Sequence, residues 1–161
     1  MVTQNSINTE NPVVQLKSSS TGSLVTCTSH IPTDDTIPQN TEGTEVLTVT
    51  ITPRSTTNLL YIYFNGLISN GVSSTICQIA LFQDSTANAL IAVRTCEELA
   101  SNSSYSTMLQ YVMPAGTTSS TTFKIRVGPE ANTCYVNGDY AGTRVFGGTA
   151  LSYLVIKELV S

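Results

Sequence analysis

Charged side chains are scarce in this sequence. They make up 11% of the 161 residues, against about 25% in an average globular domain. The net charge is −4, and the few basic residues are scattered along the chain. Nucleic-acid binding needs several cations gathered on one face, so we expect no nucleic-acid partner. The basic residues are Lys17, Arg54, Arg94, Lys124, Arg126, Arg144 and Lys157.

Long apolar runs are also absent. No segment approaches the roughly 18 to 20 apolar residues that cross a bilayer as a helix, so we expect no membrane insertion. The first residues, MVTQNSINTENP, have neither the basic start nor the apolar centre of a secretory signal. The sequence therefore predicts a protein without a signal peptide, made in the cytoplasm of the producing cell.

Residues suited to catalysis are few. The single histidine, His30, lies near Asp34 and Asp35, but no nucleophile elbow of the G-x-S-x-G type accompanies them. Asp34-Asp35 and Glu97-Glu98 are neighbours in sequence, unlike the two carboxylates that a glycosidase places across a cleft. No calcium-binding or phosphate-binding loop pattern occurs. We therefore expect no catalytic residue, no metal site, no cofactor and no enzyme activity.

The four cysteines, Cys27, Cys77, Cys96 and Cys134, are widely spaced. A zinc site wants paired ligands about two to four residues apart, which this spacing does not provide. Cys77 and Cys134 lie in strand-like segments, where a free thiol behaves as a small apolar side chain. We expect buried, reduced cysteines. A disulfide formed in an oxidising medium stays an open alternative, because nothing in the sequence selects a pairing.

Threonine and serine take the place of the missing charge, with 25 and 19 copies. Threonine favours strands, and here it alternates with apolar residues in short segments bounded by turn residues. In EVLTVTIT, residues 45–52, Leu47, Val49 and Ile51 point to one side and the threonines to the other. Eight or nine such segments follow one another along the chain, and none has a clear helical period.

This spacing predicts an all-β protein, an antiparallel jelly-roll β-sandwich of about eight strands. We expect a single domain over residues 13–161, preceded by a flexible arm of residues 1–12. Two polar segments, residues 32–44 and 100–107, are predicted to be its long loops. The best helical candidate, residues 95–105, is too short and too rich in serine and asparagine to hold more than one turn.

The segment NLLYIYF, residues 58–64, is apolar on both faces. We expect Leu60, Ile62 and Phe64 to belong to the sandwich core. A strand with two apolar faces is covered on both sides, so the opposite face is expected to pack against neighbouring subunits. The candidate interface residues are Leu59, Tyr61 and Tyr63.

The segment CYVNGDYAGTRVF, residues 134–146, has two features. Its Asn-Gly pair is typical of a type I′ hairpin turn. Its tyrosines and arginine are residue types that anchor ligands, although tyrosines packed beneath the loop are the alternative. The candidate ligand-contact residues are Tyr135, Asn137, Asp139, Tyr140 and Arg144.

Five stretches resemble a jelly-roll head domain of tail-fibre and other virion-surface proteins of tailed bacteriophages. In order they are PTDDTIPQNTEGTEVLTVTITPRSTTNLLYIYF, IALFQDSTANALIAV, MPAGTTSSTTFKIRVG, YVNG and SYLVIKEL, which together cover nearly the whole chain after residue 12. The resemblance implies a head that trimerises, similar in outline to the TNF and C1q heads, and it implies no chemistry. Such a domain usually caps a long fibre, whereas about a dozen residues precede it here.

Two functions follow from this resemblance. The first is a homotrimeric decoration or cement protein on the capsid exterior, bound to the major capsid protein, with the arm of residues 1–12 reaching onto the shell. The alternative is the receptor-binding tip of a tail fibre or spike, joined to tail proteins and contacting a glycan or protein of the host cell surface. Both imply a virion-surface location after assembly in the host cytoplasm. The lack of a shaft or coiled coil favours the first, and the loop tyrosines favour the second.

Overall fold

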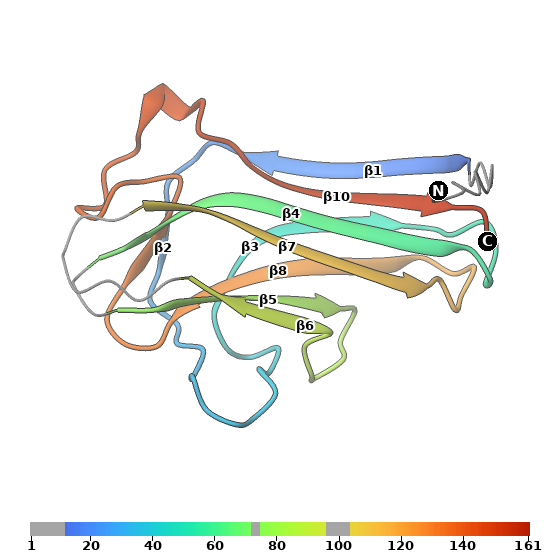
Figure 1. Cartoon of the computed structure of the whole chain (residues 1–161), viewed down its shortest axis with the longest axis horizontal. Coiled ribbons are helices and arrows are strands. Elements are labelled where there is room, and N and C mark those ends of the chain that lie inside the picture. Colours follow the sequence, from blue (N-terminus) through green and yellow to red (C-terminus); the bar gives the residue numbers. More distant parts are fainter. Residues whose placement is uncertain (1–11, 72–74, 96–103) are drawn as a thin grey trace, which may run out of the picture.

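The structure, a computed structural model, describes residues 12–71, 75–95 and 104–161. These residues form ten β-strands and one short 3₁₀ helix, η1 (Phe146–Gly148). Figure 1 shows most of the strands running along the length of the molecule. No helix in the described ranges is long and apolar enough to cross a membrane. The strands are β1 (Val13–Thr21), β2 (Val25–Cys27), β3 (Thr44–Ile51), β4 (Leu59–Asn70), β5 (Cys77–Gln83), β6 (Ile91–Arg94), β7 (Ser104–Pro114), β8 (Thr121–Pro129), β9 (Cys134–Val136) and β10 (Ser152–Leu159).

Strand pairing is nested, as in a jelly roll. β1 pairs with β10, β3 with β8, β4 with β7 and β5 with β6, all antiparallel. Because β10 also pairs with β4, and β8 with β5, the strands form a first sheet, β1-β10-β4-β7, and a second sheet, β3-β8-β5-β6. This nesting confirms the predicted antiparallel jelly-roll sandwich. The described residues form more strands than the eight or so that were predicted. The additional strands are the short β2 and β9, which pair with each other and extend the first sheet.

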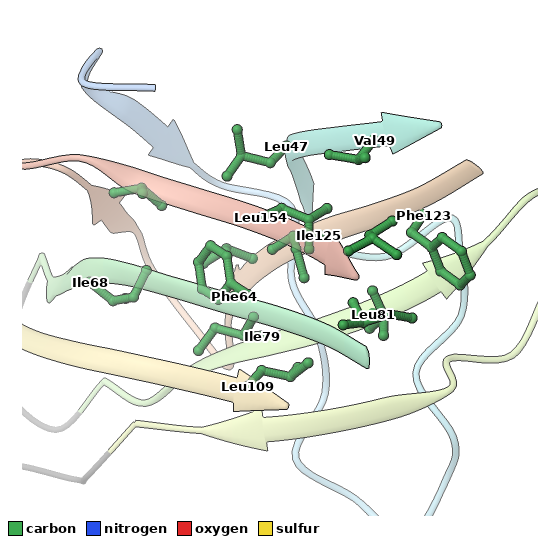
Figure 2. Close-up of a cluster of buried hydrophobic side chains, with 14 of the residues drawn as sticks. Leu47, Val49, Phe64, Ile68, Ile79, Leu81, Leu109, Phe123, Ile125 and Leu154 are labelled. Carbon is green, nitrogen blue, oxygen red and sulfur yellow. The ribbon is translucent and has the colours of Figure 1, made fainter. Parts of the chain in front are cut away.

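The core lies between the two sheets and follows from the alternation of side chains along each strand. In β8, Phe123, Ile125 and Val127 alternate with polar residues and are fully buried. Figure 2 shows Phe64 of the first sheet and Ile79 and Ile125 of the second directed into one cluster. Each large apolar side chain buried in this way contributes about 1.5–3 kcal/mol to the hydrophobic driving force.

The loop between β2 and β3, residues 28–43, covers part of the outer face of the second sheet. Its Ile31 is fully buried and packs with Ala80 and Phe82 of β5 in a small second cluster. The backbone N–H of Ile31 donates to the carbonyl of Pro129 at 3.1 Å, which anchors the loop to the end of β8. The loop predicted over residues 32–44 is confirmed up to β3, which begins at Thr44.

Other predicted boundaries have different outcomes. The loop predicted over residues 100–107 is wrong from Ser104 onward, because β7 begins there and pairs with β4. A serine-rich run fits this strand end because Ser69 and Ser104 share a hydrogen bond of 2.7 Å between their hydroxyls. The helical candidate over residues 95–105 and the arm of residues 1–12 lie mostly outside the described residues.

The predicted type I′ hairpin at Asn137-Gly138 is wrong. Asn137 has a positive φ of 60°, but β9 just before it pairs with β2 and β4 and not with the segment that follows. The chain reverses a few residues later, where Gly138 and Arg144 form an isolated antiparallel bridge. The turn lies between those two residues.

Candidate functional site

The outer face of the first sheet carries many large apolar side chains. The strand register places Leu16 beside Lys157, Lys157 beside Tyr61, and Tyr61 beside Val112, so one line crosses all four strands. Parallel lines contain Tyr153, Val155 and Tyr63, together with the polar residues Ser18, Asn65 and Gln110. We call this surface the tyrosine face. Its members are Leu16, Leu59, Tyr61, Tyr63, Met108, Val112, Tyr153, Val155 and Lys157.

The tyrosine face is open to solvent in the single chain. Leu16, Met108 and Val112 are 51%, 56% and 51% exposed, and the other members are half-buried by their neighbours in the sheet. Lys157 is its one charged member. A contiguous apolar surface of this kind on a small protein marks a place where another surface binds.

The middle of the tyrosine face is hollowed, with a volume of about 430 Å³. The rings of Tyr63 and Tyr153 pack together there, with centroids 5.7 Å apart and planes tilted by 43°. A hydrogen bond with the Tyr63 hydroxyl raises the pKa of Tyr153. The hollow is lined by Leu16, Tyr61, Tyr63, Tyr153, Val155 and Lys157.

Polar contacts hold one of these rings in place. The hydroxyl of Tyr63 lies 3.6 Å from the sulfur of Met108 and accepts a hydrogen bond of 3.4 Å from the Asn65 amide. The hydroxyl of Ser106 in turn donates to the side-chain oxygen of Asn65 at 3.3 Å. These contacts link β4 to β7 across the face, so the hollow is shaped before anything binds.

The outer face of the second sheet has a different chemistry. Thr50 and Thr122 share a hydrogen bond of 2.9 Å between their hydroxyls. Glu45 lies 4.0 Å from the Lys124 ammonium and 3.7 Å from the Arg126 guanidinium. Such exposed ion pairs and hydroxyls are well hydrated, so this face suits water and the tyrosine face does not.

The structure places all the predicted interface residues on the tyrosine face. Leu59, Tyr61 and Tyr63 are half-buried and point outward, whereas Leu60 and Ile62 are fully buried in the core, as predicted. Their role in a trimer stays a prediction. Five further members of the face were not predicted: Leu16, Met108, Val112, Tyr153 and Val155.

A sequence pattern could have indicated some of these unpredicted members of the tyrosine face. SYLVIKEL and YVMP carry apolar residues at both odd and even positions, the same two-sided pattern that NLLYIYF shows. Sequence alone does not reveal that these segments lie side by side, since β10, β4 and β7 are far apart along the chain. The register supplies that information.

The predicted ligand-contact residues do not form one surface. Asn137 is fully buried, and its amide donates to the carbonyls of Thr21 and Ser23 at 2.9 and 3.1 Å. The Asp139 carboxylate accepts hydrogen bonds from backbone N–H groups of its own turn, at 2.9 Å from Ala141 and at 2.8 Å from Thr143. Both side chains therefore hold the loop together.

The remaining three candidates differ in exposure. Tyr135 is half-buried and packs beneath the loop, with its ring close to Gly142, while Tyr140 and Arg144 are exposed. Phe146 in the same loop was not predicted. Its side chain is 76% exposed, and its backbone has a positive φ of 50°. An exposed aromatic residue followed by two glycines is the signal that points to it.

Groups suited to catalysis are not assembled in the described residues. His30 is exposed, and its carbonyl oxygen accepts a hydrogen bond of 3.1 Å from the Gly43 N–H. The carboxylate of Asp34 turns back on Thr36, whose hydroxyl and N–H lower the pKa of Asp34. No group of three or more histidine, cysteine or acidic side chains in these ranges is arranged to hold a metal ion. The absence of enzyme activity stays a prediction.

No family model and no curated protein matches the sequence. Among solved structures, the chain is similar to a structure of T=1 particles derived from infectious bursal virus, at 12% identity with a TM-score of 0.45. It is also similar to the VP2 subviral particle of infectious bursal disease virus, at 13% identity with a TM-score of 0.41. These alignments cover 92% of this chain but 37% and 39% of those chains. The chain thus spans well under half of the proteins it matches, and a likeness this weak says nothing of function.

Proposed function

We propose that this protein is a structural subunit of a virus particle that assembles as a homotrimer through the tyrosine face. The single observation that carries the proposal is the contrast between the two outer faces of the sandwich. One is rich in threonine and ion pairs, and the other presents tyrosine, leucine, valine and methionine with one charge. Burying the second face removes apolar area from water, which is the main driving force of stable association.

Three copies related by a closed rotation are the assembly that we favour. Self-association of identical chains closes through cyclic symmetry, which prevents open-ended growth. The jelly-roll heads that the sequence resembles trimerise, which sets the number at three. A stable interface buries about 800 Å² on each partner, which is the scale of four adjacent strands seen face-on.

A place on the capsid exterior, as a decoration protein bound to the major capsid protein, completes the proposal. The resemblance to phage virion-surface domains supports a virion role, and the low charge fits a surface that repels neither neighbours nor host material. No step of catalysis is assigned to the chain. The arm of residues 1–12 is proposed as the segment that contacts the shell.

The test is the oligomeric state of the purified protein and of two charge variants. Light scattering should give three times the 17.2 kDa chain mass. Val112→Glu places a carboxylate on the tyrosine face and should yield monomers. Thr50→Glu is the matched control, because Thr50 is an exposed strand residue on the polar face, and it should stay trimeric. A wild-type protein that is monomeric at every concentration contradicts the proposal, as does dissociation of the Thr50 variant alone.

A second candidate function is the receptor-binding tip of a tail fibre or spike. The exposed aromatic residues Tyr140 and Phe146 favour it, because both belong to the loop between β9 and β10. Copy number distinguishes the two functions, since hundreds of copies per particle indicate decoration and a few dozen indicate a fibre. Quantitative gel analysis of purified particles measures it.

A further inference from the structure

Three thiols lie within the core near one end of the sandwich. Cys27 in β2, Cys77 in β5 and Cys134 in β9 are all free and fully buried. The register of β2 and β9 sets Cys27 directly opposite Cys134. The sequence left any pairing open, and this register favours one.

The spacing of opposite residues in an antiparallel pair suits a disulfide. Their Cα atoms lie about 4.5 or 5.5 Å apart, depending on whether the pair is hydrogen-bonded. Disulfides join Cα atoms about 4.4 to 6.8 Å apart, so either type of pair falls within the range. Cys27 and Cys134 can therefore be joined without moving the strands.

The third thiol, Cys77, also lies beside Cys134 and hydrogen-bonds with it. The sulfur of Cys77 donates to the side-chain oxygen of Asn70 at 3.0 Å, and Cys77 belongs to the second sheet. Packed sheets lie about 10 Å apart, farther than the roughly 4.4 to 6.8 Å between the Cα atoms of a disulfide, so joining Cys77 to Cys134 would pull the two sheets together. We propose that Cys27 and Cys134 are an oxidisable pair that forms a cross-strand disulfide on exposure to a small-molecule disulfide, while Cys77 remains a thiol.

The environment of the pair assigns its order of reaction. The Cys134 thiol and the Thr44 hydroxyl both donate toward the Cys27 sulfur, and they lower the pKa of Cys27 against the effect of burial. Hydrogen bonding to Cys27 and Cys77, together with burial, raises the pKa of Cys134. Because β2 lies at the edge of its sheet, Cys27 reaches solvent first when this strand opens, so Cys27 is the attacking thiol and Cys134 resolves the intermediate.

The reaction balances as two exchanges. The Cys27 thiolate attacks one sulfur of the oxidant, forming a mixed disulfide and releasing one small thiolate. Cys134 then gives up its proton, and its sulfur attacks that of Cys27 and displaces the second small thiolate. Two protein thiols are oxidised, one small disulfide is reduced to two thiols, and the protons of the cysteines pass to the released thiolates.

Access to the buried pair requires only local opening. β2 has three residues, lies at the edge of its sheet and, in the described part of the chain, pairs with β9 alone. Edge strands this short open far more readily than the whole domain unfolds. Once formed, the disulfide fastens β2 to β9 and closes a long loop of chain.

Peptide mapping tests the proposal without any mutation, because trypsin places each cysteine in a different peptide. The native protein is incubated with oxidised glutathione, alkylated, digested and analysed by mass spectrometry. We expect the Cys27 peptide linked to the Cys134 peptide, and a melting temperature raised by roughly 5–15 °C. A link from the Cys134 peptide to either other cysteine peptide, or four alkylated cysteines, overturns the proposal. The peptides are residues 18–54, 55–94, 95–124 and 127–144.

Two matched variants distinguish the role of the Cys27–Cys134 pair from that of the neighbouring thiol, Cys77. Cys77→Ala should keep the linked peptides and the rise in melting temperature on oxidation. Cys27→Ala should lose both, with a melting temperature that no longer depends on the oxidant. If oxidation still raises the melting temperature of Cys27→Ala, the stabilising link lies elsewhere and the assignment is wrong.

Discussion

Glu158 is the one acidic side chain that the described residues bury completely. Burial alone would raise its pKa, but hydrogen bonds from the side chains of Gln15 and Asn58, at 2.5 and 2.6 Å, and from the Arg54 N–H at 2.8 Å outweigh it. The net effect lowers the pKa of Glu158. The carboxylate thereby ties β1 and the β3–β4 loop to the end of β10.

We predict that Glu158→Gln lowers the free energy of unfolding by about 1–3 kcal/mol at pH 7, because an amide cannot accept all of these hydrogen bonds. A lowered pKa in the folded state means that the carboxylate stabilises the fold above its ordinary pKa near 4.5. That contribution is lost as the pH falls through the folded-state pKa. Urea denaturation should therefore show a large difference between variant and wild type at pH 7 and a small one in acid.

The matched control for this prediction is Glu45→Gln, which removes a carboxylate from exposed ion pairs. It should change stability by well under 1 kcal/mol at either pH. A Glu158 variant with the same deficit at pH 7 and in strong acid would show that packing, and not charge, is responsible.

Asn137 shows where sequence reasoning ends at the scale of a residue. Asn-Gly predicts a residue with positive φ, and Asn137 has one. The predicted hairpin fails because the amide is used over long range. It bonds the carbonyls of Thr21 and Ser23 and accepts from the Ser152 hydroxyl at 2.7 Å. Thr21 and Ser23 lie more than a hundred positions away from Asn137, and local sequence cannot reveal partners at that distance.

Among the elements, the loop over the second sheet depends on a glycine. A Cβ atom at Gly128 would lie 2.6 Å from the carbonyl oxygen of Ser29 and 2.7 Å from the Ile31 side chain. We predict that Gly128→Ala pushes this loop away from the sheet and costs about 1–3 kcal/mol. Faster limited proteolysis within residues 28–43 would be the direct measurement.

Gly116→Ala is the comparison for this loop prediction. Its Cβ would meet no atom within 4 Å, so it tests the cost of a left-handed backbone alone, at a φ of 65°. We expect it to leave proteolysis of residues 28–43 unchanged. Equal cleavage in the two variants would show that general destabilisation is the cause.

Strands with one buried face could be predicted from sequence, and the assembly surface only in part. EVLTVTIT and TTFKIRVG alternate because one side meets the core and the other meets water, so the pattern contains the answer. NLLYIYF identified one strand of the tyrosine face because both of its faces are apolar. Predicting the rest of that face requires knowing which strands are neighbours. Nested pairing places segments from both ends of the chain side by side, and the sequence does not show this.

For the whole molecule, the proposed arm can be tested by deletion. The described fold begins at Pro12, whose carbonyl oxygen accepts a hydrogen bond of 3.3 Å from the Val160 N–H. We predict that removing residues 2–11 leaves the melting temperature and the trimer unchanged and abolishes co-sedimentation with the particle. Three linked weak contacts per trimer would be lost together.

Val112→Glu in the full-length chain complements the deletion. It keeps the arm but should separate the subunits, so binding should weaken to that of a single contact. Undiminished co-sedimentation of the truncated trimer would show that the sandwich itself holds the particle.

The antiparallel pairing of β1 with β10 gives the molecule a direction along its length. Val13 pairs with Leu159, so the two ends of the described chain leave the sandwich side by side, and η1 lies at the opposite end (Figure 1). A passenger protein fused after Ser161 would emerge beside β1, at the end of the sandwich from which the arm proposed to contact the shell also leaves. A short epitope inserted at Gly147, where an added Cβ meets no other atom within 4 Å, would be presented at the far end. One chain therefore offers two display positions, one at each end of the sandwich.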